Sequence, residues 1–261
     1  MRTKLIVFLG MFGGLAAGNC LAQAQKAQTA ASAPVAKLER MPESRETRFA
    51  LSAAPPHARG GATVLLLDPA KGYVASRHGT NGVSCIVVRS DWQFEQPFRN
   101  DIYWAVCFDA EGSRTLLNDY LIAAELRARG IDSQQVHGDV TKKFGRPDYP
   151  NPSRIGIAYM IAPVMRGFTA PEPQTMNMPH YMFYAPNVND ADIGGEGFSK
   201  QYPFVLSMNP GRDDYIIMLV GEAEKAKILG ESEDLLNELC SYRSFLCATA
   251  ATMARTPLDR Q

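Results

Sequence analysis

Three β-rich segments in close succession constrain the fold of this chain more than any other feature. They are ATVLLLD at residues 62–68, GYVASRH at 72–78 and VSCIVVRS at 83–90. Only the turn-forming links PAKG and HGTNG separate them, and Asn81-Gly82 in the second link suits a backbone with positive φ. The pattern predicts a meander of antiparallel strands, which IYWAVCFD at 102–109 extends.

After this run, helical periodicity replaces strand alternation. The spacing of apolar residues predicts a helix over 117–124 that Gly130 terminates, and a second short helix over 132–145. Three further strands are expected in IGIAYMIAP, MNMPHYMFYAP and DYIIMLVG. A helix capped by Ser232 closes the chain. Its apolar face consists of Leu235, Leu236, Leu239, Cys240 and Leu246. We therefore expect an α+β fold: a mainly antiparallel sheet with an inserted helical segment and a C-terminal helix.

The N-terminus has the pattern of a secretory signal peptide over Met1–Ala24. Arg2 and Lys4 supply the positive start, residues 5–17 form the apolar run, and Ala22-Gln23-Ala24 is an A-x-A cleavage site. The mature chain is therefore expected to begin near Gln25, outside the cytoplasm.

The rest of the chain divides into a linker, one domain and a tail. Residues 25–44 are rich in Ala, Gln, Ser and Pro and predict a flexible linker, 45–250 predict a single globular domain, and 251–261 form a C-terminal tail. No stretch after the signal approaches the ~18 uninterrupted apolar residues of a membrane span. We expect a periplasmic or secreted protein with no integral membrane segment. The alternative is a lipoprotein anchored through Cys20, although Asn19 stands where a small residue is usual.

Charge excludes one class of partner. The chain has 27 basic and 27 acidic residues, and removal of the signal peptide leaves 25 against 27, a net charge of −2. The sequence has no basic stripe and no run of like charge, which are the features expected of a protein that binds nucleic acid or an anionic membrane surface.

Four cysteines remain after cleavage, which in an exported chain predicts two disulfides. Cys85 and Cys107 face each other if their strands pair in antiparallel fashion about Gln96, and this pairing is the first expectation. Cys240 and Cys247 lie ~10 Å apart in a continuous helix, beyond the ~7 Å limit for a disulfide. If these two bond, the helix must break between them; the alternative is that the thiols are reduced or paired differently.

Several motifs resemble those of a family of exported bacterial proteins of unknown function. The motifs are HGTNG, CFDAEGSRTLL and MPHYMFYAP, together with PESRETRFALSAAPPH, LDPAKGYV and VGEAEKAKIL. The resemblance spans nearly the whole mature domain. It implies no activity, cofactor or catalytic residue.

One group of candidate metal ligands alternates along TMNMPHYMFY. Met176, Met178, His180 and Met182 project from one face of an extended strand, and thioether and imidazole groups suit Cu(I). Alternate residues lie ~6.7 Å apart, so at most two neighbours, such as Met178 and His180, share an ion and need a third donor from elsewhere. The alternative is that these methionines fill an irregular core.

A second candidate metal site is the acidic segment NVNDADIGGEG. Its oxygen donors suit Ca²⁺, but the spacing D-x-[DN]-x-[DN]-G is absent, which favours a solvated surface loop. The donors are Asn187, Asn189, Asp190, Asp192 and Glu196. No cofactor is expected otherwise.

A hydrolase is the alternative to a non-catalytic protein. The motifs G-x-S-x-G, H-E-x-x-H and S-x-x-K are absent, so a hydrolytic site would have to form in three dimensions. The candidate bases are His57, His78 and His180, and the candidate carboxylates are Asp68, Asp109 and Glu111.

A group of aromatic residues predicts a binding cleft if one face of the sheet is open, and core packing if both faces are covered. These aromatic residues are Tyr181, Phe183, Tyr184, Tyr202 and Phe204. An apolar cleft of this kind suits a small molecule or a peptide. The sequence therefore favours a non-catalytic binding or envelope-associated domain, whose partner is a small molecule or an envelope protein.

Overall fold

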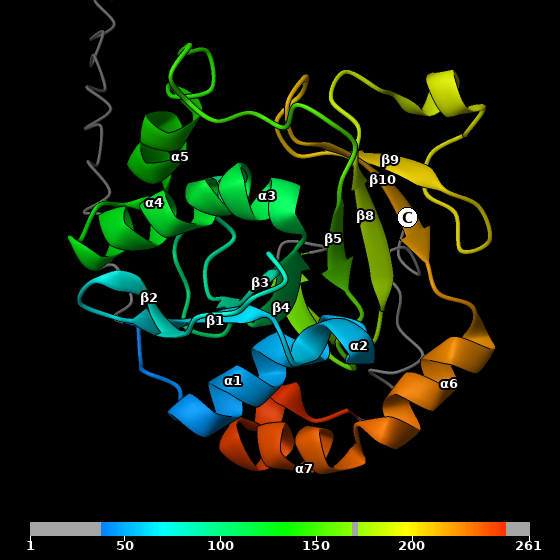
Figure 1. Cartoon of the computed structure of the whole chain (residues 1–261). Helices are drawn as coiled ribbons and strands as arrows, with labels where there is room; N and C mark the ends of the chain where they lie inside the picture. The colour runs from blue at the N-terminus through cyan, green and yellow to red at the C-terminus, as the bar shows by residue number, and fades with distance from the viewer. Residues whose placement is uncertain (1–37, 169–171, 249–261) are drawn as a thin grey trace, which may run out of the picture. The chain divides into compact units, whose positions relative to one another are not determined.

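One mixed sheet of eight strands organises the computed structural model, which describes residues 38–168 and 172–248 (Figure 1). The expected signal peptide with Cys20, the linker up to residue 37 and the tail at 251–261 lie outside these residues. The strands follow the order β2-β1-β3-β4-β5-β8-β10-β9. Their bounds are β1 Thr63–Asp68, β2 Gly72–Arg77, β3 Ser84–Val88, β4 Trp104–Phe108, β5 Ile157–Met160, β8 His180–Tyr184, β9 Phe204–Ser207 and β10 Asp214–Leu219.

A two-stranded antiparallel sheet and seven α-helices complete the described part of the chain. The small sheet pairs β6, Met165–Phe168, with β7, Pro173–Met176. The helices are α1 Glu43–Ser52, α2 Pro56–Arg59, α3 Ala110–Arg114, α4 Leu117–Ala128, α5 Ser133–Thr141, α6 Glu222–Glu231 and α7 Glu233–Tyr242. Short 3-10 helices occupy η1 Trp92–Phe94, η2 Asp190–Ile193 and η3 Ser244–Leu246. The predicted α+β fold is confirmed.

The order of the first three strands corrects the prediction of a meander. β1 and β2 form an antiparallel pair, but β3 lies on the other side of β1 and runs parallel to it. The link HGTNG therefore crosses the start of β1, where the backbone nitrogens of Thr80 and Asn81 donate to the Gly61 carbonyl. Gly79 makes this crossing possible, because a Cβ there would lie 2.2 Å from the Gly61 oxygen.

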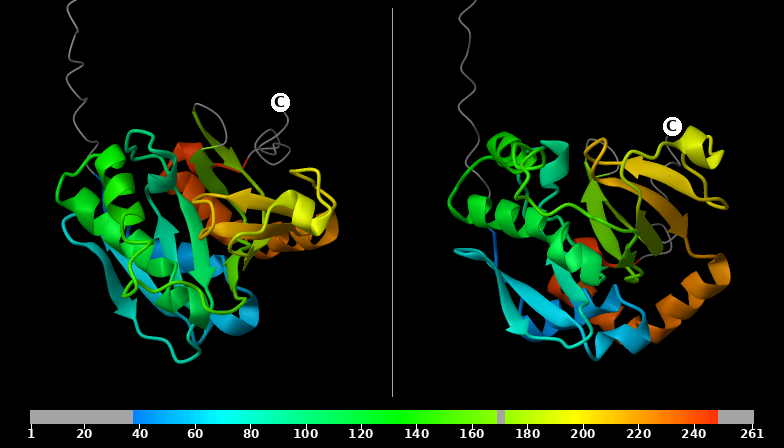
Figure 2. Two further views of the ribbon diagram at one scale, coloured as in Figure 1. Left: turned by 90° about the horizontal axis from the view of Figure 1, so that it is seen from above. Right: turned by 45° about the horizontal axis from the view of Figure 1, so that its top comes forward.

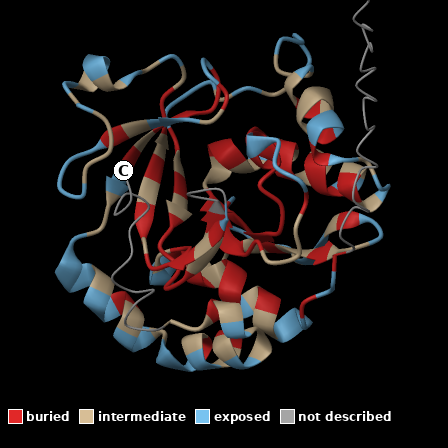
Figure 3. Ribbon diagram, turned by 180° about the vertical axis from the view of Figure 1, so that it is seen from behind, coloured by how far each residue is buried: buried red, intermediate tan, exposed pale blue. Residues whose placement is uncertain are grey.

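Helices cover the two faces of the central strands. β3 and β4 are buried along their whole length. Alternate residues pack on one face against α4 and α5 and on the other against α1 and α7. Figure 3 shows this burial in red along the strands, with exposed residues on the outer helices. Figure 2 shows α4 and α5 at one end of the sheet and the loop with η2 at the other.

The ends of the domain differ from the predicted bounds. The predicted linker includes residues 38–44, yet Leu38 and Met41 are buried and α1 begins at Glu43. Their apolar side chains pack on the sheet although no periodicity marks them. The predicted closing helix is two helices that meet at Ser232, whose side chain makes no capping hydrogen bond.

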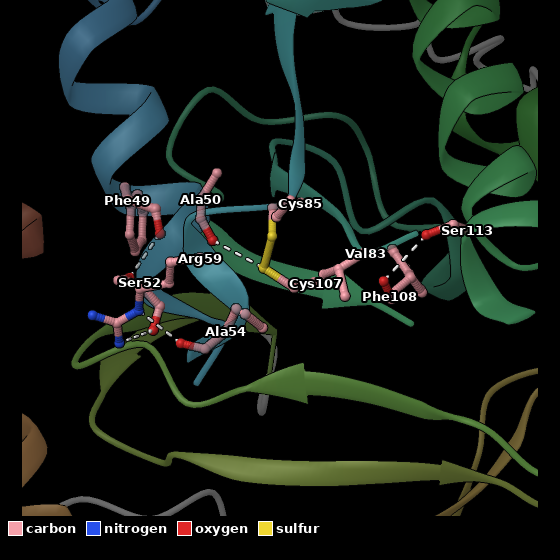
Figure 4. Close-up of a disulfide and its surroundings, with 12 residues drawn as sticks. Phe49, Ala50, Ser52, Ala54, Arg59, Val83, Cys85, Cys107, Phe108 and Ser113 are labelled. Atoms are coloured by element: carbon pink, nitrogen blue, oxygen red, sulfur yellow. Dashed lines mark hydrogen bonds between the residues drawn. A yellow bond between two sulfur atoms is a disulfide. The ribbon is translucent and has the colours of Figure 1, made fainter. Parts of the chain in front are cut away.

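Both expected disulfides are present. Cys85 and Cys107 are opposite each other in the β3–β4 pair, and the Cys107 sulfur lies 3.3 Å from the Ala50 carbonyl oxygen of α1 (Figure 4). Cys240 bonds to Cys247. Their Cα atoms are 4.2 Å apart because α7 ends at Tyr242 and the chain turns back, as such a bond requires.

None of the helices in residues 38–168 and 172–248 has the length and apolar character needed to cross a bilayer.

Candidate binding cavity

An apolar cavity of about 380 Å³ lies against β5, β8, β10 and β9 on the sheet face that also carries α4. Five methionines line it: Met160, Met165, Met178, Met182 and Met208. Aromatic rings supply much of the remaining wall: Phe94, Trp104, Tyr120, Phe198 and Phe204. The other lining residues are Asp91, Gly167, His180, Val205, Leu206 and Ile217.

Strand register places the side chains of the cavity floor. Met160 of β5 is directly opposite His180 of β8, and Ile217 of β10 is opposite Met182. Residues directly opposite in an antiparallel pair share a face, as do alternate residues of one strand. His180 and Met182 of β8, Met160 of β5 and Ile217 of β10 therefore project from the same face of three adjacent strands.

The structure corrects the expectation of one continuous strand carrying all four candidate copper ligands. Met176 ends β7 in the small sheet, where it pairs with Met165, and β8 begins only at His180. The intervening residues 177–179 are outside any strand, because Pro179 has no backbone N–H to donate to a ladder. Met178, His180 and Met182 reach the cavity, whereas Met176 does not line it.

His180 lines the cavity, and one of its two ring nitrogens is unprotonated. Its side chain is buried, with 3% of the residue exposed, and Nδ1 lies 2.7 Å from the Met178 carbonyl oxygen. A carbonyl only accepts, so Nδ1 carries the hydrogen and Nε2 carries the lone pair. Among the described residues, the hydrogen bond of Nδ1 is the only one that the ring makes. Burial lowers the pKa of His180, although the bond to Met178 opposes this shift, and the ring is neutral at pH 7.

A carboxylate forms the second polar point of the cavity wall. Asp91 precedes η1, and its Oδ1 accepts a hydrogen bond of 2.6 Å from Trp104 Nε1 on β4. The Tyr120 hydroxyl of α4 accepts a bond of 2.8 Å from Gln93 Nε2. These contacts fix the indole and phenol rings that close the cavity on the α4 side.

A buried ionic cluster anchors the turn between β9 and β10. Arg212 Nη1 donates to Asp119 Oδ2 of α4 at 2.5 Å and to Asp213 Oδ1 at 2.6 Å. Tyr149 donates its hydroxyl hydrogen to the other Asp119 oxygen. Burial raises the pKa values of both aspartates, against the opposing charge of Arg212. Because Phe204, Leu206 and Met208 precede this turn, the cluster ties one wall of the cavity to α4.

The candidate hydrolase groups do not converge. His57 and His78 are exposed, and His180 makes no hydrogen bond or ion pair with any of the three candidate carboxylates. Asp109 instead caps α3 and accepts from the Ile157 nitrogen, while Asp68 pairs with Arg40. Glu111 accepts hydrogen bonds from Ser153 and pairs with Arg114 and Arg154. The hydrolase alternative stays a prediction.

The acidic segment 187–196 folds onto itself. Asn189 and Asp192 form a capping box on η2, and Asp190 Oδ1 accepts from the Val205 nitrogen at 2.8 Å. In residues 38–168 and 172–248, no three His, Cys, Asp or Glu side chains are grouped to hold a metal ion. Calcium binding stays a prediction.

Of the five residues predicted to form an aromatic cleft, only one lines this cavity. Phe204 lines the cavity, and its ring packs at a tilt against that of Phe198, with ring centroids 4.7 Å apart. Tyr184 is buried and donates to the Ile157 carbonyl, and Tyr202 is 70% exposed. Tyr181 and Phe183 lie on the opposite face of β8, partly exposed, as alternation requires.

Sequence reasoning missed most of the cavity wall. Met160, Met165 and Met208 come from three separate segments. The pairing of β5 with β8 places Met160 opposite His180, and the other two methionines line the same cavity. The one local signal was the pairing of methionine with histidine in NMPHYM.

Searches of protein-family models, curated proteins and solved structures find no match to this chain.

Proposed function

We propose that this chain is a non-catalytic binding protein of an extracytoplasmic compartment, and that its cavity takes a small apolar molecule carrying one hydrogen-bond donor. The observation that carries the proposal is the cavity itself: an apolar wall of methionines and aromatic rings, with His180 Nε2 as a free acceptor. Small-molecule sites have this composition, a volume of about 300–1,000 Å³ and a few fixed polar groups.

The wall chemistry supports an adaptable rather than a narrow site. Methionine side chains are unbranched and polarizable, so five of them accommodate ligands of varied shape. His180 Nε2 is a hydrogen-bond acceptor, which favours a ligand with an N–H or O–H group. Two disulfides are compatible with an oxidising compartment outside the cytoplasm.

The test uses N-phenyl-1-naphthylamine, an apolar probe with one N–H group whose fluorescence rises on entering an apolar site. Leu206→Trp narrows the cavity, and Met218→Trp is its matched control. The two residues are 37% and 40% exposed and lie on neighbouring strands, but only Leu206 lines the cavity. We expect saturable binding that Leu206→Trp weakens by tenfold or more and Met218→Trp leaves unchanged. Non-saturable binding, or equal losses in both variants, would reject the proposal.

A further inference from the structure

Soft donor atoms gather at one end of the cavity, around His180. Met160 faces it from the neighbouring strand, and Met182 follows two residues later on the same face of β8. Directly opposite residues have Cβ atoms about 4.5–5.5 Å apart. The three flexible bonds of each methionine let its sulfur approach the imidazole from that position.

The backbone holds the imidazole as a metal ligand requires. Metal-binding histidines generally donate their second ring N–H to a carbonyl or carboxylate, which fixes the ring and the tautomer. Here the Met178 carbonyl, 2.7 Å from Nδ1, accepts that hydrogen. The nitrogen with the lone pair, Nε2, belongs to a side chain that is 97% buried and lines the cavity.

The donor set selects the metal. Thioether sulfur binds poorly to hard cations such as Ca²⁺ and Mg²⁺ and well to Cu(I), for which neutral imidazole is also a good ligand.

We infer that this cavity binds one Cu(I) ion through His180 Nε2 and the thioether sulfurs of Met160 and Met182. The inference rests on the cavity being open to ligands, as proposed above, and it assigns a metal ion to the end of the cavity at His180. Among the four candidate ligands predicted from sequence, it retains His180 and Met182, and it replaces Met176 with Met160. Met178 acts through its carbonyl, which orients the ring.

The experiment supplies Cu(I) as its acetonitrile complex under nitrogen. The protein competes with the chelator bicinchoninate for this ion, and the competition gives the Cu(I) affinity of each protein. The variants are Met160→Leu and Met182→Leu, which remove a sulfur and nearly conserve volume. Met208→Leu is the control, because Met208 lines the same cavity from the segment before the β9–β10 turn. Thermal unfolding of each variant checks that it folds.

We expect one Cu(I) per chain, with affinity reduced tenfold or more by Met160→Leu and by Met182→Leu, and within twofold of wild type for Met208→Leu. Absence of stoichiometric binding, or equal affinities in all four proteins, overturns the inference. So does an equal loss in Met208→Leu. Titration of the same samples with N-phenyl-1-naphthylamine separates the two proposals: if the probe binds but Cu(I) does not, only the metal site fails, and the reverse result rejects only the apolar ligand.

Discussion

Glu46 carries a titratable group into the interior. It lies on α1 with 1% of the residue exposed, and its Oε1 accepts a hydrogen bond of 2.8 Å from the Leu67 nitrogen of β1. Burial raises the pKa of this carboxyl to about 7, although the Leu67 hydrogen bond and the charges of Arg89 and Arg40 favour the ionised form. At neutral pH the group is therefore close to half protonated.

Glu46→Gln should flatten the pH dependence of stability. In the unfolded chain Glu46 ionises near pH 4.5, so between about pH 4.5 and 7 the native state holds a proton that the unfolded state has lost. The free energy of unfolding of wild type therefore falls as pH rises through this window, by on the order of 3 kcal/mol. Urea unfolding of both proteins at pH 5 and pH 8 measures this difference. Equal pH dependence in the two proteins would contradict it.

The sequence predicted that Met178, His180 and Met182 lie close together, because they alternate within one short segment of the chain. Met160 was beyond reach of the sequence, because its position beside His180 depends on the register between β5 and β8. The pairing of Cys85 with Cys107 was predictable because β3 and β4 follow each other in sequence. A single polar segment connects them, so an antiparallel pair about its midpoint brings the two cysteines opposite each other.

At the scale of elements, the crossover between β2 and β3 decides the topology of the first half of the sheet. Gly79 lies against the backbone of residues 61–63, with an added Cβ placed 2.2–2.4 Å from atoms of that backbone. Backbone atoms inside a sheet cannot retreat as a flexible side chain does. The position therefore admits only glycine while β1 and β3 stay paired.

Gly79→Ala should destabilise the protein by at least ~3 kcal/mol, since it forces the crossing segment away from β1. Gly60→Ala is the control, because a Cβ at Gly60 meets nothing within 4 Å and its φ is −61°. That change should alter stability by about 1 kcal/mol or less. Chemical denaturation of the three proteins provides the comparison, and equal midpoints for the two variants would argue against a crowded crossing.

The length of an element explains part of what the sequence could predict. The strands that became β1 to β4 and the helix α4 have enough residues to show a period. β6, β7 and β9 have four residues each, too few for alternation to be visible. α1 follows Pro42 and has no side-chain cap, so its start carries no signal of the usual kind.

Across the whole molecule, the two disulfides constrain different regions. Cys85–Cys107 joins two strands at the centre of the sheet, across 22 residues of sequence. Cys240–Cys247 closes a loop across 7 residues at the end of α7. That loop holds η3, where Leu246 is buried and the Phe245 carbonyl accepts a hydrogen bond from Thr175 of β7.

Replacing each pair by alanines should destabilise the protein to different extents. By the entropy of loop closure, the first disulfide contributes about 3 kcal/mol and the second about 2 kcal/mol. Removing Cys85 and Cys107 also deletes two buried sulfurs, which adds a packing cost. Urea unfolding of the two double variants tests the order, and a larger loss for the Cys240 and Cys247 pair would be inconsistent with it.

The packing of α1 against α7 also has a consequence in time. Phe49 near the start of the domain shares a core with Leu235 and Leu239 near its end, and Arg48 pairs with Glu238. Any process that delivers the chain from its N-terminus, whether the ribosome or an export channel, delivers these leucines last. The apolar residues that pack against α7 must therefore stay uncovered until almost the whole chain has emerged.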